Sequence, residues 1–375
     1  MFGTIRCAII GVLLVHAAYL VCRHRRCTVP RTEVLLVRGA YLVYSVESSL
    51  ERMHVGFRGR TMQSPFRHSQ PMGAGKNLDT AHRSDHWPSG KRLPASVAAY
   101  LACVLEVLAP KAGNVHVHQS FDDATVLDYI ASAAVLAPLL DETARRGVGA
   151  TVLEAVRRTR LVARTNTNLG IVLLLAPLTA VPAECSLAEG IAAVLNSLTV
   201  EDSRAVYAAI RLASPAGLGK VPDQDIGDEP TLPLQTIMQL AANRDLIARQ
   251  YACAFRDVFA FGVPCLLQAL EQGRCLADSL VWCQLHWLAE FGDSLIARKC
   301  GHAISQEAAE RARQVLTLGW PDTLAGQEAF SELDCWLRGD GHRRNPGTTA
   351  DLVVATLFVT LRDGLIPVPF TVRWA

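Results

Sequence analysis

The chain has 375 residues, of which half are apolar and 19% are charged, and its formal net charge at pH 7 is +2. This hydrophobicity excludes an intrinsically disordered chain, which combines low hydrophobicity with high net charge. The length excludes a small scaffold stapled by disulfides. The net charge hides a division: residues 1–92 carry fourteen Lys and Arg against five Asp and Glu, whereas residues 93–375 carry twenty-three against thirty. We therefore treat a basic N-terminal arm and a mildly acidic body separately.

Within the arm, residues 7–22 form an apolar run of sixteen residues. A membrane-spanning helix needs about 20 residues, with about 17 as the lower limit, so the run is short for this role. Residues 56–91 are rich in Gly, Ser, Pro, His and Arg, which is typical of a linker. We interpret residues 1–92 as a basic, poorly ordered extension outside the catalytic fold, part of which is not translated. Membrane contact through residues 7–22 and an ordered extension stay open as alternatives, and no nucleic-acid partner is expected.

From residue 93 onward Ala and Leu dominate, and apolar residues recur every three and four positions, as in amphipathic helices. The alternation typical of strands is not found in this part. The sequence therefore predicts an all-α body, a single large multi-helix domain over residues 93–375, with Ser96 capping its first helix and residues 366–375 as a packed tail. The expected helices are 96–108, 128–140, 150–165, 187–198, 200–212, 233–261, 275–291, 306–318, 325–338 and 349–362.

The eleven cysteines are odd in number and form no CxxC pair, which argues against a disulfide framework or a zinc ribbon. Several lie in predicted helices, where a free thiol behaves as a small buried apolar group. This favours a reducing, cytoplasmic location. The sequence also lacks the glycine-rich motifs of dinucleotide-binding and P-loop proteins and the GxSxG motif of hydrolases.

Polar residues of the body gather at breaks between apolar helices, where functional sites often form. In the first such cluster, Lys111 lies where a cation could meet phosphate, and Asp123 could hold Mg²⁺ or, with Asp122, cap the helix beginning near Thr125. Zinc is not expected, because His116 and His118 lack a third ligand at suitable spacing. The cluster comprises Glu106, Lys111, Asn114, His116, Asp122 and Asp123.

The second cluster, residues 164–170 (RTNTNLG), directly precedes the apolar segment IVLLLAPL. A helix that is apolar all round is buried, so its N-terminal N–H groups need partners. Asn and Thr are good caps, and a helix N-terminus also favours an anion. Because Asn166 and Asn168 exceed what one cap requires, we favour an anion site over capping alone.

In the third cluster, residues 291–301, Asp293 begins a short helix that Arg298 and Lys299 close. Charges matched to the helix dipole are an equal alternative to a functional role.

The fourth cluster, NPGTTAD, places Asn345, Thr348 and Asp351 at the start of another apolar helix. Asp351 could orient a metal or a sugar hydroxyl there, or simply favour the helix start as an acidic residue.

Taken in order, the motifs E-x4-K-x-G-N-V-H, N-T-N-L-G, D-S-L-I-A-R-K-x-G and N-P-G-T-T-A-D-L resemble those of the triphosphoribosyl-dephospho-CoA synthase family. This family serves the prosthetic-group pathway of citrate lyase and malonate decarboxylase. The resemblance spans about residues 96–364 and none of the arm. It implies an all-helical fold and transfer of the triphosphoribosyl group of ATP to the ribose 2′-hydroxyl of 3′-dephospho-CoA, with release of adenine. ATP and dephospho-CoA, or a related acceptor, would be the substrates, and Mg²⁺ the inferred cofactor.

The resemblance also implies roles for the clustered residues. Asp293 or Glu106 would act as the base or stabilise the oxocarbenium-like ribose, and Asp123 and Asp351 would hold Mg²⁺. Phosphate would contact Lys111, Arg298 and Lys299. The remaining substrate-binding residues would be Asn114, His116, Asn166, Asn168, Asn345 and Thr348.

The chain departs from the better-known members of this family at several positions. Ala112 replaces the proline of a K-P-G motif, Thr125 replaces the second aspartate of D-M-D, and residues 217–226 replace a segment rich in Gly and Arg. It is similar to a divergent branch found in organisms with methanopterin-type one-carbon cofactors. ATP as donor is therefore the firmer expectation, and transfer to a pterin- or furan-type acceptor is the second hypothesis. A non-catalytic helical binding protein and a membrane-tethered scaffold are the third and fourth.

Overall fold

The computed structural model describes residues 32–37, 40–45, 92–215, 217 and 219–375. The chain divides into two compact units, Met1–His82 and Arg83–Ala375. In the first unit, strands β1 (Thr32–Val37) and β2 (Ala40–Ser45) pair in an antiparallel hairpin, with Thr32 opposite Ser45. We did not predict this hairpin, although both segments are rich in β-branched and aromatic residues. The apolar run 7–22 and the linker 56–91 lie outside the described residues.

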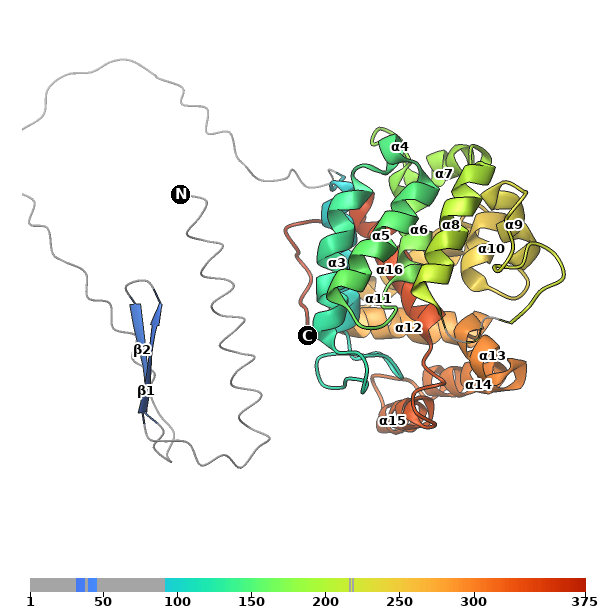
Figure 1. The fold of residues 1–375 in the computed structure, drawn as a ribbon. Helices are drawn as coiled ribbons and strands as arrows, with labels where there is room; N and C mark the ends of the chain where they lie inside the picture. The colour runs from blue at the N-terminus through green and yellow to red at the C-terminus, as the bar shows by residue number, and fades with distance from the viewer. Residues whose placement is uncertain (1–31, 38–39, 46–91, 216, 218) are drawn as a thin grey trace, which may run out of the picture. The chain divides into compact units, whose positions relative to one another are not determined.

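The second unit is built of helices in the part described here, apart from one isolated bridge between His116 and Gln119, and this confirms the all-α prediction for the body (Figure 1). None of the described helices has both the length and the apolar character needed to cross a bilayer. The helices are α2 (Ala95–Leu108), α3 (Val126–Leu140), α4 (Thr143–Arg146), α5 (Val148–Val162), α6 (Leu169–Thr179), α7 (Leu187–Asn196), α8 (Val200–Ala213), α9 (Leu234–Ala241), α10 (Leu246–Ala252), the π-helix η1 (Val258–Gly262), α11 (Val263–Glu271), α12 (Leu276–Phe291), α13 (Ser294–Cys300), α14 (His302–Thr317), α15 (Leu324–Arg338) and α16 (Gly347–Arg362).

The single long helix predicted over 233–261 is wrong. Asp245 caps α10 by accepting hydrogen bonds from the N–H groups of Ile247 and Ala248, so α9 and α10 are separate helices. A further break follows at Ala254 and Phe255, whose φ angles of 49° and 57° are left-handed. Apolar periodicity continues across both breaks, and it therefore could not reveal them.

Two predicted caps are also wrong. Pro94, not Ser96, occupies the N-cap position of α2, and the backbone N–H of Ser96 donates to Asp141 Oδ1 at 2.9 Å. At α3 the cap is Thr125, whose hydroxyl and N–H both donate to the Asp128 carboxylate, rather than Asp122 or Asp123.

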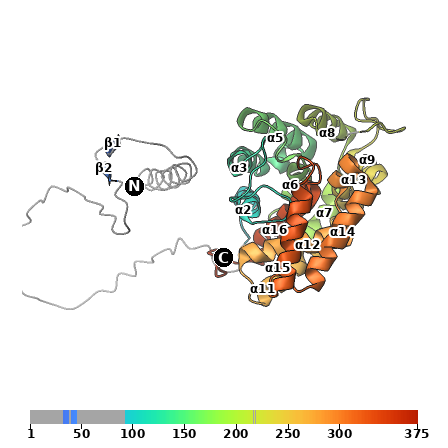
Figure 2. The same cartoon turned by 90° about the horizontal axis from the view of Figure 1, so that it is seen from below.

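Helices α6 and α16 form the centre of the body, and both are buried over almost their whole length (Figures 1 and 2). Helix α16 packs against α2, α6 and α12, and α6 also packs against α5. Fully burying one Leu or Val side chain contributes about 1.5–3 kcal/mol, so these two helices dominate the core. Their N-terminal ends consequently lie inside the protein, where the backbone N–H groups need partners.

The C-terminal tail packs against the start of α12, as predicted. The N–H groups of Leu276 and Ala277 donate to the carbonyl oxygens of Arg373 and Trp374 at 2.8 and 2.9 Å. The tail thereby satisfies two donors of the first turn of α12.

Helices α5 and α8 approach each other most closely at Gly149. Its N–H donates to Asp202 Oδ1 at 2.8 Å, and a Cβ added here would lie 2.5 Å from Asp202 Cα. We expect Gly149→Ala to lower the free energy of unfolding by about 1–3 kcal/mol, because backbone must move to admit the methyl group. Urea denaturation measures this, with Gly219→Ala as control, since no heavy atom lies within 4 Å of its added Cβ. Equal effects of the two changes would contradict the prediction.

Candidate functional site

A cavity of about 1260 Å³ opens beside the N-terminal ends of α6 and α16. Its walls also include residues of α2, α5, α8, α9, α10 and α13. Binding sites for single drug-sized ligands usually measure about 300–1000 Å³. The cavity therefore has room for two substrates side by side.

Residues from all four predicted polar clusters meet at this cavity. Of the thirteen predicted site residues, ten line it and three do not. Those that do not are Lys111, His116 and Asp293. Those that line it are Glu106, Asn114, Asp123, Asn166, Asn168, Arg298, Lys299, Asn345, Thr348 and Asp351.

Lys111 is completely buried and is bound to the protein itself. Its Nζ lies 3.0 Å from Glu106 Oε1 and donates to the carbonyl oxygens of Glu106 and Ala109 at 2.5 and 3.4 Å. Burial raises the pKa of Glu106, and the attraction of Lys111 opposes this. The geometry thus gives Lys111 the role of holding Glu106 at the cavity wall, instead of the phosphate contact expected from the sequence.

Asn114 and Asn345 form part of a buried amide network. Asn114 Nδ2 donates to Asn345 Oδ1 at 2.7 Å, and Gln284 Nε2 donates to Asn114 Oδ1 at 2.8 Å. This network joins the loop after α2 to α12 and to the segment before α16. His116 belongs to the same loop as Asn114. Burial lowers the pKa of His116 to about 4, so its imidazole is neutral at pH 7.

The carboxylate of Asp293 joins two helices and does not face the cavity. Its Oδ1 accepts hydrogen bonds from the N–H groups of Leu295 and Ile296 at 2.9 and 3.0 Å. Its Oδ2 accepts the N–H and the hydroxyl of Thr349 at 2.7 and 2.8 Å. Both oxygens are thus occupied at a residue only 1% exposed. Asp293 is therefore placed to position α13 against α16, and not to act as the base.

The second cluster caps α6 only in part. Asn166 Oδ1 accepts the N–H of Leu169 at 3.0 Å, whereas Asn168 Nδ2 donates to Thr159 Oγ1 at 2.8 Å. Among the described residues, the N–H groups of Gly170 and Ile171 have no hydrogen-bond acceptor. Two donors of a buried helix start therefore face the cavity region without a protein partner, as an anion site requires.

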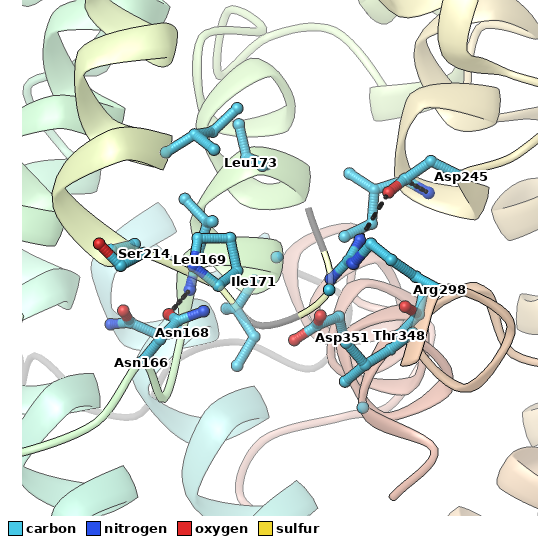
Figure 3. A pocket seen from close by; sticks show the side chains of 18 of the residues that line it. Asn166, Asn168, Leu169, Ile171, Leu173, Ser214, Asp245, Arg298, Thr348 and Asp351 are labelled. Carbon is cyan, nitrogen blue, oxygen red and sulfur yellow. Dashed lines mark hydrogen bonds and ion pairs between the residues drawn. The ribbon is translucent and has the colours of Figure 1, made fainter. Parts of the chain in front are cut away.

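Asp351, the fifth residue of α16, lies against the first turn of α6. A Cβ added at Gly170 would fall 1.9 Å from Asp351 Oδ2, so only glycine permits this approach. Figure 3 shows the Asp351 carboxylate on one side of the cavity and Asn166 and Asn168 on the other. Burial, followed by repulsion from Glu106 and Asp293, raises the pKa of Asp351. Within the described part of the chain, no hydrogen-bond donor or cation contacts its carboxylate.

Two cations of α13 line the same wall. Arg298 Nη1 lies 3.5 Å from Asp245 Oδ2 (Figure 3). Lys299 is half-buried, and burial followed by the charge of Arg298 lowers its pKa. Its ammonium group has no partner among the residues that the structure describes. Thr348 lies beside them and accepts a hydrogen bond from Ser294 Oγ at 3.1 Å.

Several lining residues were missed by the sequence analysis. Asp245 lies within the segment that was predicted as one helix, and an Asp after Asn-Arg was the available signal for a cap there. Arg160, Arg164 and Arg244 also line the cavity. They belong to predicted helices or their ends, where the sequence gives no sign of which face they occupy.

The second predicted metal ligand, Asp123, is exposed. Its side chain is 56% exposed, and Oδ1 lies 3.5 Å from Nε2 of His342, whose ring stacks on Phe121. No group of three or more His, Cys, Asp or Glu side chains suited to a metal ion occurs in the described ranges.

Comparison with known proteins agrees with this geometry. Residues 94–368 match the ATP:dephospho-CoA triphosphoribosyl transferase family, and this span contains every residue that lines the cavity. The crystal structure of an Archaeoglobus fulgidus protein assigned as a triphosphoribosyl-dephospho-CoA synthase is similar, with a TM-score of 0.50 and 29% sequence identity. The similar region covers 63% of this chain and 99% of that one. No curated protein matches the chain.

We expect Asp293→Asn to lower stability by about 1–3 kcal/mol, because an amide cannot accept from both helix starts and a buried donor loses its partner. We also expect a higher KM for ATP, since α13 and α16 lose their fixed relation. Thermal unfolding and steady-state kinetics measure the two effects. Thr349→Val is the matched control, because it removes only the hydroxyl bond to Asp293. Loss of turnover at unchanged stability and unchanged KM would instead indicate that Asp293 is a catalytic residue.

Proposed function

The chain belongs to the ATP:dephospho-CoA triphosphoribosyl transferase family, and we propose that the cavity beside α6 and α16 is where the triphosphoribosyl group moves from ATP to dephospho-CoA. One observation carries this assignment. The Asp351 carboxylate, the Lys299 ammonium group and two N–H groups of α6, none of which has a partner among the described residues, line or adjoin one cavity. An enzyme that handles a polyphosphate beside a developing cationic ribose needs these groups.

The reaction breaks the bond between ribose C1′ and adenine N9 in ATP, and the electron pair leaves with adenine, which takes up a proton. A bond forms between C1′ and the acceptor hydroxyl oxygen, whose proton must be accepted. We assign this proton to Glu106. Lys111 holds one of its oxygens, and Glu106 also lines the cavity. Burial raises its pKa, and a carboxylate with a raised pKa is a stronger base.

The triphosphate stays on the transferred group and needs a fixed binding surface. Lys299 and the N–H groups of Gly170 and Ile171 offer a cation and two donors that bind no other group in the part of the chain that the structure describes. Such preorganised groups need no rearrangement when charge develops during the reaction. Arg298, already bound to Asp245, adds positive charge to the same wall.

Mg²⁺ fits this site only together with the substrate. The ion commonly uses one or two carboxylates plus substrate phosphates and keeps several waters. Asp351 is a free oxygen ligand at the cavity wall, and no preformed three-ligand group is found in the described part. Bound there, Mg²⁺ would neutralise charge on the triphosphate.

We also propose that the reaction takes place in the cytoplasm. The support is the set of free thiols buried in the described body, Cys103, Cys265 and Cys283, which suits a reducing compartment.

The direct test is incubation of the full chain with ATP, Mg²⁺ and dephospho-CoA, followed by chromatography for free adenine. We expect adenine and triphosphoribosyl-dephospho-CoA in equal amounts, and no adenine without the acceptor. Adenine release only with a pterin- or furan-type acceptor would keep the cavity as the site and replace the acceptor. No release with either acceptor would reject the proposal.

Asp351→Asn separates the two aspartates that the sequence offered as Mg²⁺ ligands. We expect turnover to fall by a factor of about 100 or more, because the loss of a carboxylate that binds the metal ion removes a few kcal/mol of transition-state stabilisation. The Mg²⁺ concentration for half-maximal rate should rise. Asp123→Asn, at an exposed position, should stay within about twofold of the unmodified enzyme. The assignment fails if Asp123→Asn is the more damaging change.

A further inference from the structure

One part of the cavity is not used by the transfer chemistry proposed above. It is a groove between α8 and α9. On α9 and just beyond it, Ile237, Leu240, Ala241 and Arg244 line the cavity, and their spacing of three, four and seven residues places them on one helix face. On α8, Val206, Ile210 and Ala213 line it with the spacing of another single face. The two helices contact each other.

The ends of these two helices point toward the reacting wall. Helix α9 begins beside the start of α8, because the N–H of Leu234 donates to the carbonyl of Thr199 at 3.2 Å. At the other end of α9, Asp245 pairs with Arg298. Going back along the chain from Asp245, Arg244 is the next residue, and Leu240 lies about one helical turn further toward the start of α9. A ligand leaving the reacting wall along α9 therefore meets a cation first and apolar side chains next.

One large apolar side chain of this groove is exposed. Leu240 is 52% exposed, although it lies in a helix whose other large apolar residues, Leu234, Ile237 and Met238, are buried. A ligand that covers this leucine gains free energy by removing its apolar surface from water.

The groove also supplies cations that carry no carboxylate partner. Arg160 Nη1 donates to the carbonyl of Leu212 at 2.5 Å, and Arg244 Nη1 donates to that of Leu240 at 3.2 Å. In the residues described, neither guanidinium forms an ion pair with Asp or Glu. Each guanidinium group therefore keeps N–H donors for an anionic ligand, and such groups suit phosphate oxygens.

We propose that this groove binds the part of the acceptor that lies beyond the reacting ribose, namely the diphosphate and the pantetheine arm of dephospho-CoA. The inference rests on the proposed function. In dephospho-CoA the diphosphate follows the ribose, and the long pantetheine arm follows the diphosphate, with a gem-dimethyl group and methylene groups between its two amides. This order matches Arg244 followed by Leu240 and Ile237. ATP has no group beyond its phosphates that would cover an apolar groove, so the groove selects the acceptor and not the donor.

The test compares Leu240→Asn with Leu324→Asn. Leu324 is a matched control, because it is 71% exposed, belongs to α15 and does not line the cavity. We expect Leu240→Asn to raise the KM for dephospho-CoA about five- to tenfold through lost apolar contact, with kcat and the KM for ATP within about twofold of the unmodified enzyme. Leu324→Asn should leave all three constants unchanged. An unchanged KM for dephospho-CoA in Leu240→Asn, or an equal rise in both KM values, would overturn the proposal.

A second measurement needs no variant. Pantetheine 4′-phosphate, which is the arm with one phosphate, should inhibit the unmodified enzyme competitively against dephospho-CoA and not against ATP. No inhibition, or competition with ATP, would count against the groove. Turnover of the unmodified enzyme decides the proposed function separately. If it releases no adenine, calorimetric binding of dephospho-CoA to the two leucine variants still decides the groove.

Discussion

The Asp293 carboxylate fixes the wall on which the rest of the site depends. One oxygen satisfies the start of α13 and the other the start of α16, through four hydrogen bonds in a buried setting. Losing one such bond would leave an unsatisfied donor in a low dielectric, which is costly. Lys299 on α13 and Asp351 on α16 are therefore held in a fixed relation before any substrate arrives. Because both charged groups are already in place, they do not need to rearrange when charge develops on the reacting group.

Four carboxylates lie in or beside this wall, and the structure balances three of them in different ways. Glu106 is paired with Lys111, Asp245 with Arg298, and Asp293 is satisfied by hydrogen bonds. Asp351 alone among these four has no such partner in the described residues. The net negative charge of the body therefore does not indicate the charge of its ligand. A polyphosphate responds to the local balance, and here one carboxylate, one ammonium group and two N–H groups have no partner within the described ranges.

Apolar periodicity was sufficient to predict the all-α body, because the spacing of apolar residues within a helix defines its buried face. Ten of the thirteen site residues predicted from the four polar clusters line the cavity, since buried helix starts must gather polar partners. The sequence could not show which partner each charged side chain contacts. Lys111 folds back onto Glu106 through the turn at Ala109, at the end of α2. Asp293 and Thr349 are distant in the chain, and Arg244 reaches the cavity only because α9 and α10 separate. Each of these depends on tertiary contacts that no local pattern records.

The close approach of Asp351 to α6 links the glycine of the second cluster to the carboxylate that we propose as a Mg²⁺ ligand. With no side chain at Gly170, the carboxylate lies directly on the first turn of a helix whose free N–H groups attract anions. A triphosphate drawn to the same helix start would then meet a second anion at short range. Two anions in a partly desolvated site repel strongly unless a cation lies between them or one takes up a proton. Burial, followed by repulsion from Glu106 and Asp293, already raises the pKa of Asp351 in the free protein. A Mg²⁺ ion arriving with the triphosphate would offset the repulsion between the two anions, and we therefore propose that substrate and cation bind together.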